Sequence, residues 1–381
     1  MFLQNKQSFS LNTEQNFTQR FLSLNWGLIL LISMISVAGV LSLYSAANGS
    51  FSPWAAKHLI RYVICFVGMI CVAMVDLRWW YRLAYVPFFL GLILLITVEV
   101  MGRTGMGAQR WIDLGVFQLQ PSELMKIGVI MALARYYHTI GADNVNNPLL
   151  ILWPLILISL PVGLVLMQPD LGTAIMIALA GGAVLYLAGV SIWFFLGIGS
   201  LGILSLPVIW QFLRDYQKER IMTFLNPESD PLGSGYHILQ SKIALGSGGI
   251  EGKGFLKGTQ SHLNFLPEKQ TDFIFTLWAE EWGLMGGLGL LTIMGGVFAY
   301  CLWIANQCRL RFARILVAGL TINFSLYIII NIAMVMGIIP VVGVPLPLIS
   351  YGGTSMLAVM IAFGLIMSCY VYRDRKLQSF F

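Results

Sequence analysis

The chain has 381 residues, of which 57% are hydrophobic and only 10% are charged. Its mean hydropathy is +0.78. Soluble domains carry about 25% charged residues, so this composition excludes an ordinary water-soluble protein and indicates a polytopic membrane protein. The net charge of +6 fits basic residues flanking membrane helices better than a nucleic-acid surface, so no nucleic-acid partner is expected.

Ten membrane spans are predicted, since a bilayer core of about 30 Å needs roughly 20 apolar residues per helix. In chain order they are residues 22–44, 57–75, 82–101, 122–138, 147–167, 171–189, 192–211, 272–304, 312–337 and 354–372. We therefore expect an all-α polytopic membrane protein in which residues 1–381 form a single integral membrane domain. The first 20 residues are polar, and no cleavable signal peptide is expected.

The orientation follows from the basic residues. Ten is an even number, so both termini lie on one side of the membrane. Arginines and lysines concentrate in the short loops and chain ends on that side, so the N- and C-termini are predicted to be cytoplasmic. Residues 212–271, between spans seven and eight, then form one large loop on the outer side.

Two parts of that loop have recognisable patterns. The stretch GYHILQSKIAL (235–245) predicts a short amphipathic helix at the membrane interface. The stretch GSGGIEGKGF (246–255) is rich in glycine but lacks the Walker pattern, so it predicts a flexible loop and not a nucleotide site.

Polar side chains gather at the outer ends of the even-numbered spans. They are Lys57, Arg61, Ser122, Glu123, Lys126, Asp170, Thr271 and Asp272. Helix N-termini attract anions through free N–H groups and the helix dipole. An outward-facing anion site is therefore predicted.

Several of these residues also have a purely structural interpretation. In PSELMK (121–126), Ser122 is expected to cap a helix and Glu123 to pair with Lys126. Ionisable groups at membrane depth are costly and usually face a cavity, so a functional role is equally open. In QPDLGT (168–173), a helix cap by Asp170 is the favoured interpretation.

The stretch FLPEKQTDFIFTLWAEEWG (265–283) concentrates five charges where the chain is otherwise apolar. Thr271 or Asp272 could cap the eighth span. On a helix starting there, Glu280 would lie about 80° around from Asp272 and roughly 12 Å deeper. Asp272 is thus expected alone at the mouth, beside Glu268 and Lys269. Glu280 and Glu281 are expected deeper on different helix faces, in packing or pairing inside the bundle.

Near the C-terminus, the stretch GIIPVVGVPLPLISYGGTS (337–355) is broken by proline and glycine just before the last span. Non-helical backbone at membrane depth is tolerated where it is buried in protein or lines a cavity. We expect this segment to form the wall of a site.

Six motifs together resemble the SEDS family of bacterial membrane proteins, which includes RodA and FtsW. They are GAQRWIDLG (107–115), QPSELMK (120–126), QPDLGT (168–173), NPESDPLGSGYHILQSKIALGSGG (226–249), FLPEKQTDFIF (265–275) and PVVGVPLPLISYGG (340–353). The resemblance covers about residues 25–375 in the same order. The NPESDPLGSGYH run, Lys242 and the short N-terminus are more similar to RodA, the elongation member, than to FtsW, the division member.

This resemblance implies a peptidoglycan glycosyltransferase that polymerises lipid II, an undecaprenyl-diphosphate-linked disaccharide-pentapeptide, during cell elongation and maintenance of rod shape. It implies a multi-pass protein of the bacterial inner membrane with its active site facing the periplasm. The implied partners are a class B penicillin-binding protein transpeptidase and other membrane proteins of the elongation complex. Within the matching motifs, Asp272 is the essential acid, and Glu123 and Lys126 are important.

The predicted chemistry assigns Asp272 as the base for the acceptor hydroxyl. A departing diphosphate needs positive charge, and the candidate substrate-binding residues are Lys57, Arg61, Arg110, Glu123, Lys126, Asp170, Glu268 and Lys269. No cofactor is certain, and a divalent cation (Mg²⁺ or Mn²⁺) on Asp272 or Glu123 is an open alternative. A lipid II flippase or a non-catalytic scaffold of the elongation complex are the rival functions, and the nearly charge-free inner halves of the spans favour the enzyme.

Overall fold

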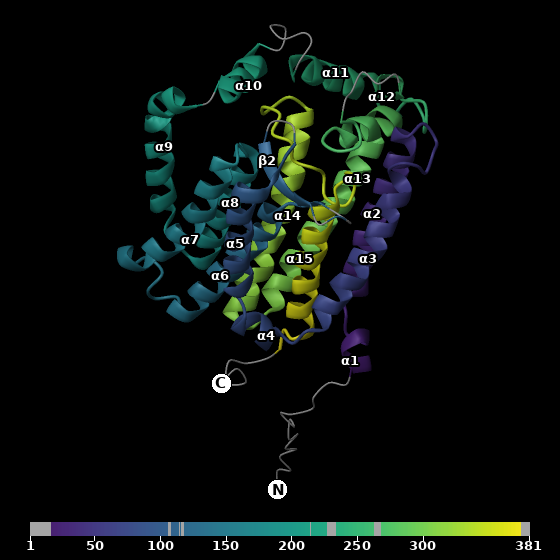
Figure 1. The fold of residues 1–381 in the computed structure, drawn as a ribbon. Coiled ribbons are helices and arrows are strands. Elements are labelled where there is room, and N and C mark those ends of the chain that lie inside the picture. The colour runs from purple at the N-terminus through teal and green to yellow at the C-terminus, as the bar shows by residue number, and fades with distance from the viewer. Residues whose placement is uncertain are drawn as a thin grey trace.

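The computed structural model describes residues 17–105, 108–113, 115, 118–213, 215–226, 234–262 and 268–374, which form a bundle of long helices (Figure 1). Within these residues, seven helices are long and apolar enough to cross a membrane. They are α2 (Trp26–Ala46), α3 (Ala55–Met74), α7 (Pro148–Met167), α8 (Leu171–Ala188), α13 (Ile274–Gln307), α14 (Arg311–Val335) and α15 (Gly353–Val371). The helices α5 (Val86–Met101), α6 (Pro121–Ile140) and α9 (Ile192–Phe212) coincide with the other three predicted spans. The count of ten spans stays a prediction.

The core is one large apolar cluster that runs from Leu24 to Tyr372. The helix α6 lies within it, packed against α5, α8 and α14, while α15 packs on α3 and α2 packs on α13. The first four turns of α6 are buried almost without interruption, from Pro121 to Ala134. Any polar side chain near the start of α6 is therefore held inside the bundle.

The two ends of the bundle differ (Figure 1). One end carries α1 (Phe17–Leu22), α4 (Leu77–Arg82) and the C-terminal end of α15. The opposite end, called the loop end below, carries a small sheet together with α10 (Asp215–Leu225), α11 (Ser234–Ser247) and α12 (Thr259–His262). The helix α11 confirms the short helix predicted for residues 235–245.

A small antiparallel sheet at the loop end departs from the all-α prediction. Its strands are β1 (Arg103–Gly105), β2 (Ala108–Asp113) and β3 (Gln118–Leu119), in the order β1-β2-β3. Its longest strand, β2, contains Trp111 and Ile112, an aromatic and a β-branched residue of the kinds that are enriched in strands. The hairpin leads directly from α5 into α6 and places β2 beside the N-terminal end of α6.

The segment 337–352 between α14 and α15 is non-helical, as predicted. Two glycines allow its backbone to lie against helices. A Cβ at Gly39 of α2 would lie 2.6 Å from the carbonyl oxygen of Leu348, and a Cβ at Gly172 of α8 would lie 2.8 Å from that of Val342. Only glycine tolerates such close backbone approach, so these two positions fix the segment between the helices.

The helix α13 is broken at Gly283, where φ is 63° and ψ is −163°. At the break, backbone groups of α13 lose their partners within the helix and form hydrogen bonds with the backbone of the glycine-rich loop. The backbone N–H of Leu284 donates to the oxygen of Gly249 at 2.9 Å, and the N–H of Lys253 donates to the oxygen of Glu280 at 3.0 Å. This loop is therefore anchored on α13, and the prediction of a flexible loop was wrong.

Each of the two glutamates of α13 has a hydrogen-bond partner inside the protein. Lys253 Nζ donates to Glu280 Oε1 at 2.7 Å, and the hydroxyl of Ser45 on α2 donates to Glu281 Oε1. Both carboxylates are at most 1% exposed. The predicted bundle-internal pairing of Glu280 and Glu281 is confirmed.

The start of α13 differs from the prediction. Residues 268–273 form a turn, in which the N–H of Thr271 donates to the oxygen of Glu268 at 3.0 Å, and the helix begins at Ile274. Its N-cap is Phe273, without a side-chain cap. The prediction that Thr271 or Asp272 caps this helix was wrong, and Asp272 lies instead in a turn outside it.

Candidate active site at the loop end

A polar cavity of about 70 Å³ lies where β2, α6, α8 and α14 meet the 337–352 segment. Its lining includes Arg110, Gln120, Glu123, Asp170, Tyr327 and Gly343. Three predicted site residues, Arg110, Glu123 and Asp170, are thus brought together from separate elements. We call this the polar cavity.

Glu123, which lines the polar cavity, forms a buried ion pair with Lys126. Lys126 Nζ lies 2.6 Å from Glu123 Oε1, and the two side chains are 1% and 5% exposed. The pairing predicted from their spacing is confirmed. The predicted cap by Ser122 was wrong, because the N-cap residue of α6 is Gln120 and it makes no side-chain cap.

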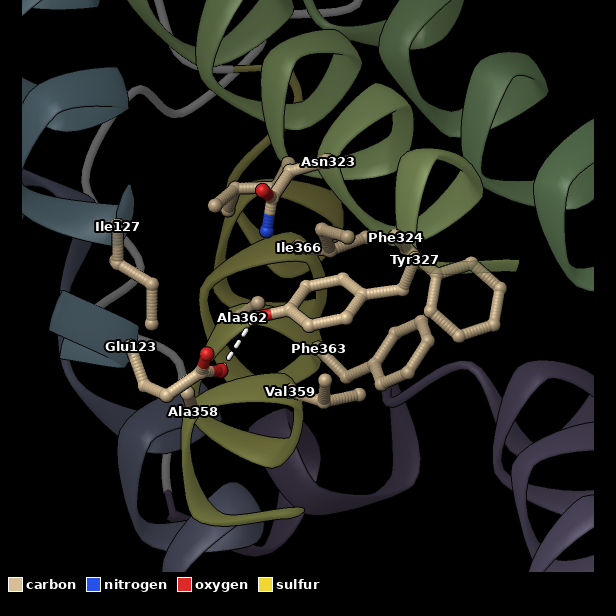
Figure 2. Close-up of a pocket in the computed structure, with 11 residues that line it drawn as sticks. Glu123, Ile127, Asn323, Phe324, Tyr327, Ala358, Val359, Ala362, Phe363 and Ile366 are labelled. Carbon is tan, nitrogen blue, oxygen red and sulfur yellow. Dashed lines mark hydrogen bonds between the residues drawn. The ribbon is translucent and has the colours of Figure 1, made fainter. Parts of the chain in front are cut away.

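Tyr327 of α14 completes this group. Its hydroxyl donates a hydrogen bond to Glu123 Oε2, and its ring lies 4.1 Å from Lys126 Nζ in a cation–π contact. Figure 2 shows Tyr327 reaching across from α14 to the carboxylate of Glu123. Because both oxygens of Glu123 have a bound donor, the desolvation of this charge is offset.

A second, smaller cavity lies on the other side of Glu123, among α6, α14 and α15 (Figure 2). Its volume is about 10 Å³, which is at the limit for one water molecule. Its walls are apolar apart from Glu123, Asn323 and Tyr327. Glu123 and Tyr327 therefore separate the polar cavity from an apolar interior.

Asp170 and Arg110 form the opposite side of the polar cavity. Asp170 Oδ1 accepts the N–H of Thr173 at 3.2 Å, which confirms the predicted cap of α8. Arg110 Nε lies 3.6 Å from Asp170 Oδ2, and the Arg110 guanidinium also donates to the carbonyl oxygen of Pro169. The Arg110 side chain stays 26% exposed, so a cationic group is held in place yet open to a ligand.

Asp272 lies at the edge of the polar cavity, next to the lining residue Gly343. A Cβ built on Gly343 would lie 3.4 Å from Asp272 Oδ2. Gly343 has φ of 73°, a conformation that favours glycine. Glu268 and Lys269 lie in the same turn, where Glu268 Oε2 accepts the hydroxyl of Thr271 at 3.1 Å. Lys269 is 6% exposed, and burial lowers the pKa of its ammonium group.

The remaining predicted residues lie apart. Lys57 is exposed on α3, and Arg61 one turn later lies with its guanidinium 4.6 Å from the centre of the Tyr351 ring. Neither side chain lines the polar cavity. The predicted set therefore divides into the cavity residues, the Asp272 turn and a separate basic pair on α3.

The residues present fit a divalent cation poorly. Within the described parts of the chain, no group of three or more His, Cys, Asp or Glu side chains could hold a metal ion. Both oxygens of Glu123 are already bound by Lys126 and Tyr327. We derive no reaction step through a metal.

Two contributors to the site were missed by sequence reasoning, namely Tyr327 and Asn331. Together with Asn323 they recur every four residues along the apolar helix α14, a spacing that puts side chains on one helix face. Polar residues within a membrane helix usually face the bundle interior or a cavity. This spacing is the signal that could have identified them.

The family model of the cell cycle proteins FtsW, RodA and SpoVE matches residues 17–375. The peptidoglycan glycosyltransferase MrdB of Escherichia coli K12 is 42% identical over 355 residues, which cover 92% of this chain and 95% of MrdB. A probable peptidoglycan glycosyltransferase FtsW of Trichlorobacter lovleyi is 34% identical over 360 residues, covering 90% of this chain and 91% of that protein.

Solved structures show the same fold. A structure describing how a peptidoglycan synthase complex coordinates polymerization and crosslinking matches with a TM-score of 0.79 at 30% identity, over 93% of this chain and 99% of that chain. The rod shape determining protein RodA of Thermus thermophilus matches with a TM-score of 0.71 at 27% identity, over the same 93% and 99%. This chain therefore belongs to the FtsW, RodA and SpoVE family.

Proposed function

We propose that this protein is a peptidoglycan glycosyltransferase that polymerises lipid II at the outer face of the bacterial cytoplasmic membrane during cell elongation. The observation that carries the proposal is the polar cavity, which is bordered by Asp272 and lined by Arg110 and by Glu123, the carboxylate that pairs with Lys126. Its similarity to MrdB, 42% identical over nearly the whole chain, supports the same activity.

In the proposed reaction, Asp272 accepts the proton of the acceptor sugar hydroxyl. The hydroxyl oxygen forms a bond to the anomeric carbon of the donor, and the bond from that carbon to the diphosphate oxygen breaks. A base for this step must lie within direct or one-water reach of the hydroxyl. The turn that holds Asp272 lies outside α13, so the carboxylate borders the polar cavity instead of facing into the bundle.

The departing diphosphate carries the charge that the site must stabilise. Arg110 is suited to this role because Asp170 and Pro169 fix its guanidinium while part of the side chain remains exposed. Lys126 is buried against Glu123 and the Tyr327 ring. We therefore propose that Lys126 balances the charge of Glu123 and does not bind the diphosphate directly.

The proposed orientation has ten spans, cytoplasmic termini and the loop end facing the periplasm. It is supported by α1 and the end of α15 lying together at the end opposite the polar cavity (Figure 1). We further propose a class B penicillin-binding protein as partner, because the similar chain of 30% identity belongs to a complex that couples polymerization with crosslinking. Other elongation-complex membrane proteins would join this assembly.

The test is polymerisation of purified lipid II by the purified protein, with and without Mg²⁺ or Mn²⁺. Asp272→Asn is expected to make no glycan polymer while it folds and binds its partner like the wild type. The matched control is Glu251→Gln, which changes an exposed acid on the anchored glycine-rich loop and is expected to keep wild-type activity.

The same preparation separates the rival functions. Full polymerising activity of Asp272→Asn would contradict its role as the base. A liposome assay in which the wild type moves lipid II across the bilayer without making polymer would indicate a flippase. A wild-type protein that does neither, yet supports its partner's reaction, would indicate a scaffold.

A further inference from the structure

Asn331 is an amide side chain with no exposed surface, four residues before α14 ends at Val335. The residues around it, YIIINIAMV, are apolar. Burying an amide without hydrogen bonds costs roughly 1–3 kcal/mol in proteins. The partners of Asn331 therefore explain its presence in this helix.

Asn331 joins two segments that are distant in sequence. Its Nδ2 donates to the carbonyl oxygen of Asp272 at 2.9 Å and to that of Val344 at 2.7 Å. Carbonyl oxygens only accept hydrogen bonds, so the NH₂ group, and not the amide oxygen, must face both partners. One side chain thereby links the Asp272 turn to the wall of the polar cavity, which Val344 lines.

The carbonyl oxygens of the two residues before Asp272 also accept hydrogen bonds. The backbone N–H of Tyr351 donates to the oxygen of Gln270 at 2.8 Å, and the hydroxyl of Ser350 donates to the oxygen of Thr271 at 2.6 Å. These two bonds fasten the turn to the 337–352 segment. The bonds from Asn331 fasten both the turn and the segment to α14.

The same helix holds the other carboxylate of the site. Tyr327, one helical turn before Asn331, donates to Glu123 and contacts Lys126, and residues four apart share a helix face. We propose that Asn331 is a positioning residue that sets the place of the Asp272 carboxylate relative to the Glu123–Lys126 pair. The proposal rests on the proposed function, in which Asp272 is the base.

The first test is Asn331→Leu, which keeps the number and branching of the side-chain heavy atoms and removes both donors. Because a misplacement of about 1 Å can cost roughly 100-fold in rate, kcat for lipid II polymerisation is expected to fall by about that factor. The KM for lipid II is expected to stay near the wild-type value, since Arg110 and Asp170 are untouched. The matched control is Thr321→Val, which removes a buried hydroxyl on the same helix that donates to Val317 at 2.7 Å, and it is expected to keep the wild-type rate.

A second variant, Asn331→Asp, keeps the side-chain shape and regains a donor only when its carboxyl group is protonated. The ratio of its rate to the wild-type rate is therefore expected to rise as the pH falls. The wild type is measured at each pH, so the ratio removes pH effects that the two proteins share. The rates are normalised to the folded fraction of each protein at each pH, so a residue that only stabilises the fold would give a ratio that does not change with pH.

A readout independent of activity is hydrogen exchange at the amide of Tyr351, which is expected to be faster in Asn331→Leu. If the wild type makes polymer and Asn331→Leu has the same kcat, the positioning role is overturned. The positioning role is also overturned if the ratio of the Asn331→Asp rate to the wild-type rate does not change with pH. This second measurement decides the question if Asn331→Leu does not fold. If the wild type makes no polymer, the proposed function fails instead, while the exchange measurement still tests the link.

Discussion

The hydroxyl of Tyr327 donates a hydrogen bond to the carboxylate of Glu123, although the two residues are 204 positions apart in the chain. The ring of Tyr327 also lies 4.1 Å from Lys126 Nζ. One side chain thus binds both members of the buried ion pair by different means. The hydroxyl donates a hydrogen bond to the anion, and the ring face makes a cation–π contact with the cation.

Tyr327→Phe separates these two contributions, because phenylalanine keeps the ring beside Lys126 and removes the donor to Glu123. A hydrogen bond to a charged group contributes about 1.5–3 kcal/mol, so the free energy of unfolding is expected to fall by about that amount. The polymerisation rate is expected to fall about tenfold if roughly 1.4 kcal/mol of the loss reaches the transition state. Thermal unfolding in detergent and a lipid II polymerisation assay measure the two effects.

The matched control is Tyr136→Phe, near the C-terminal end of α6. It removes a tyrosine hydroxyl that donates to the carbonyl oxygen of Leu150 at 2.6 Å, far from the ion pair along the helix. Its activity is expected to equal that of the wild type. Equal activity of Tyr327→Phe and Tyr136→Phe would show that the bond to Glu123 has no part in the reaction.

Asp170 has two roles that substitution can separate. Its carboxylate caps α8 and lies 3.6 Å from Arg110 Nε. Asparagine caps a helix as well as aspartate does, whereas alanine costs about 0.5–2 kcal/mol. Asp170→Ala is therefore expected to lower the free energy of unfolding by about that amount, with Asp170→Asn close to the wild type. Both variants are expected to polymerise lipid II more slowly, because Arg110 loses its anionic partner.

Thermal unfolding and steady-state kinetics on the same preparations distinguish the two roles. If Asp170→Asn is as unstable as Asp170→Ala, the carboxylate matters to stability through its charge and not through the cap. If Asp170→Asn polymerises at the wild-type rate, the ion pair with Arg110 has no catalytic consequence.

Features that depend on neighbouring residues could be predicted from the sequence. The long helices follow from runs of apolar residues, and the Glu123–Lys126 pair follows from a spacing of three residues. The Asp170 cap follows from an aspartate at the expected start of a helix. The exact helix starts could not be predicted, because Ser122 and Asp272 are good cap residues that the tertiary structure does not use as caps. The predicted cavity wall at 337–352 is confirmed by Gly343, Val344 and Pro345, which line the polar cavity.

Features that depend on distant parts of the chain could not be predicted. The contact between Tyr327 and Glu123 joins α14 to α6, and no local pattern specifies that partner. The break at Gly283 is stable because Gly249 and Lys253, on the glycine-rich loop, take over its backbone hydrogen bonds. From composition alone, a stretch so rich in glycine predicts flexibility, since the docking surface on α13 is not encoded in its own residues.

The anchored loop makes a direct prediction at Gly252. This residue has φ of 83°, and a Cβ there would lie 2.1 Å from the carbonyl oxygen of Glu281. Gly252→Ala is therefore expected to lower the free energy of unfolding by more than about 1 kcal/mol. The matched control is Gly246→Ala in α11, where a Cβ meets nothing within 4 Å, and it is expected to leave stability unchanged or to raise it. Similar melting temperatures for the two variants would mean that the loop detaches from α13 without cost.

The pH dependence of stability tests the environment of Lys269. Burial lowers the pKa of its ammonium group below the usual 10.5. Between the lowered pKa and 10.5, the unfolded chain binds more protons at this residue than the folded protein does. The free energy of unfolding therefore rises with pH across this window, and below it the cost of burying the charge is present in full.

Lys269→Met removes the titrating group, so its stability is expected to rise less with pH across this window than that of the wild type. Lys257→Met, which removes an exposed lysine at the loop end, is the matched control and is expected to follow the wild-type profile. Melting temperatures of the three proteins in one detergent, from neutral pH to 10.5, measure the difference. If Lys269→Met follows the wild-type profile as well, Lys269 keeps its charge in the folded protein at no cost, and the turn beside Asp272 is more open to water than its burial indicates.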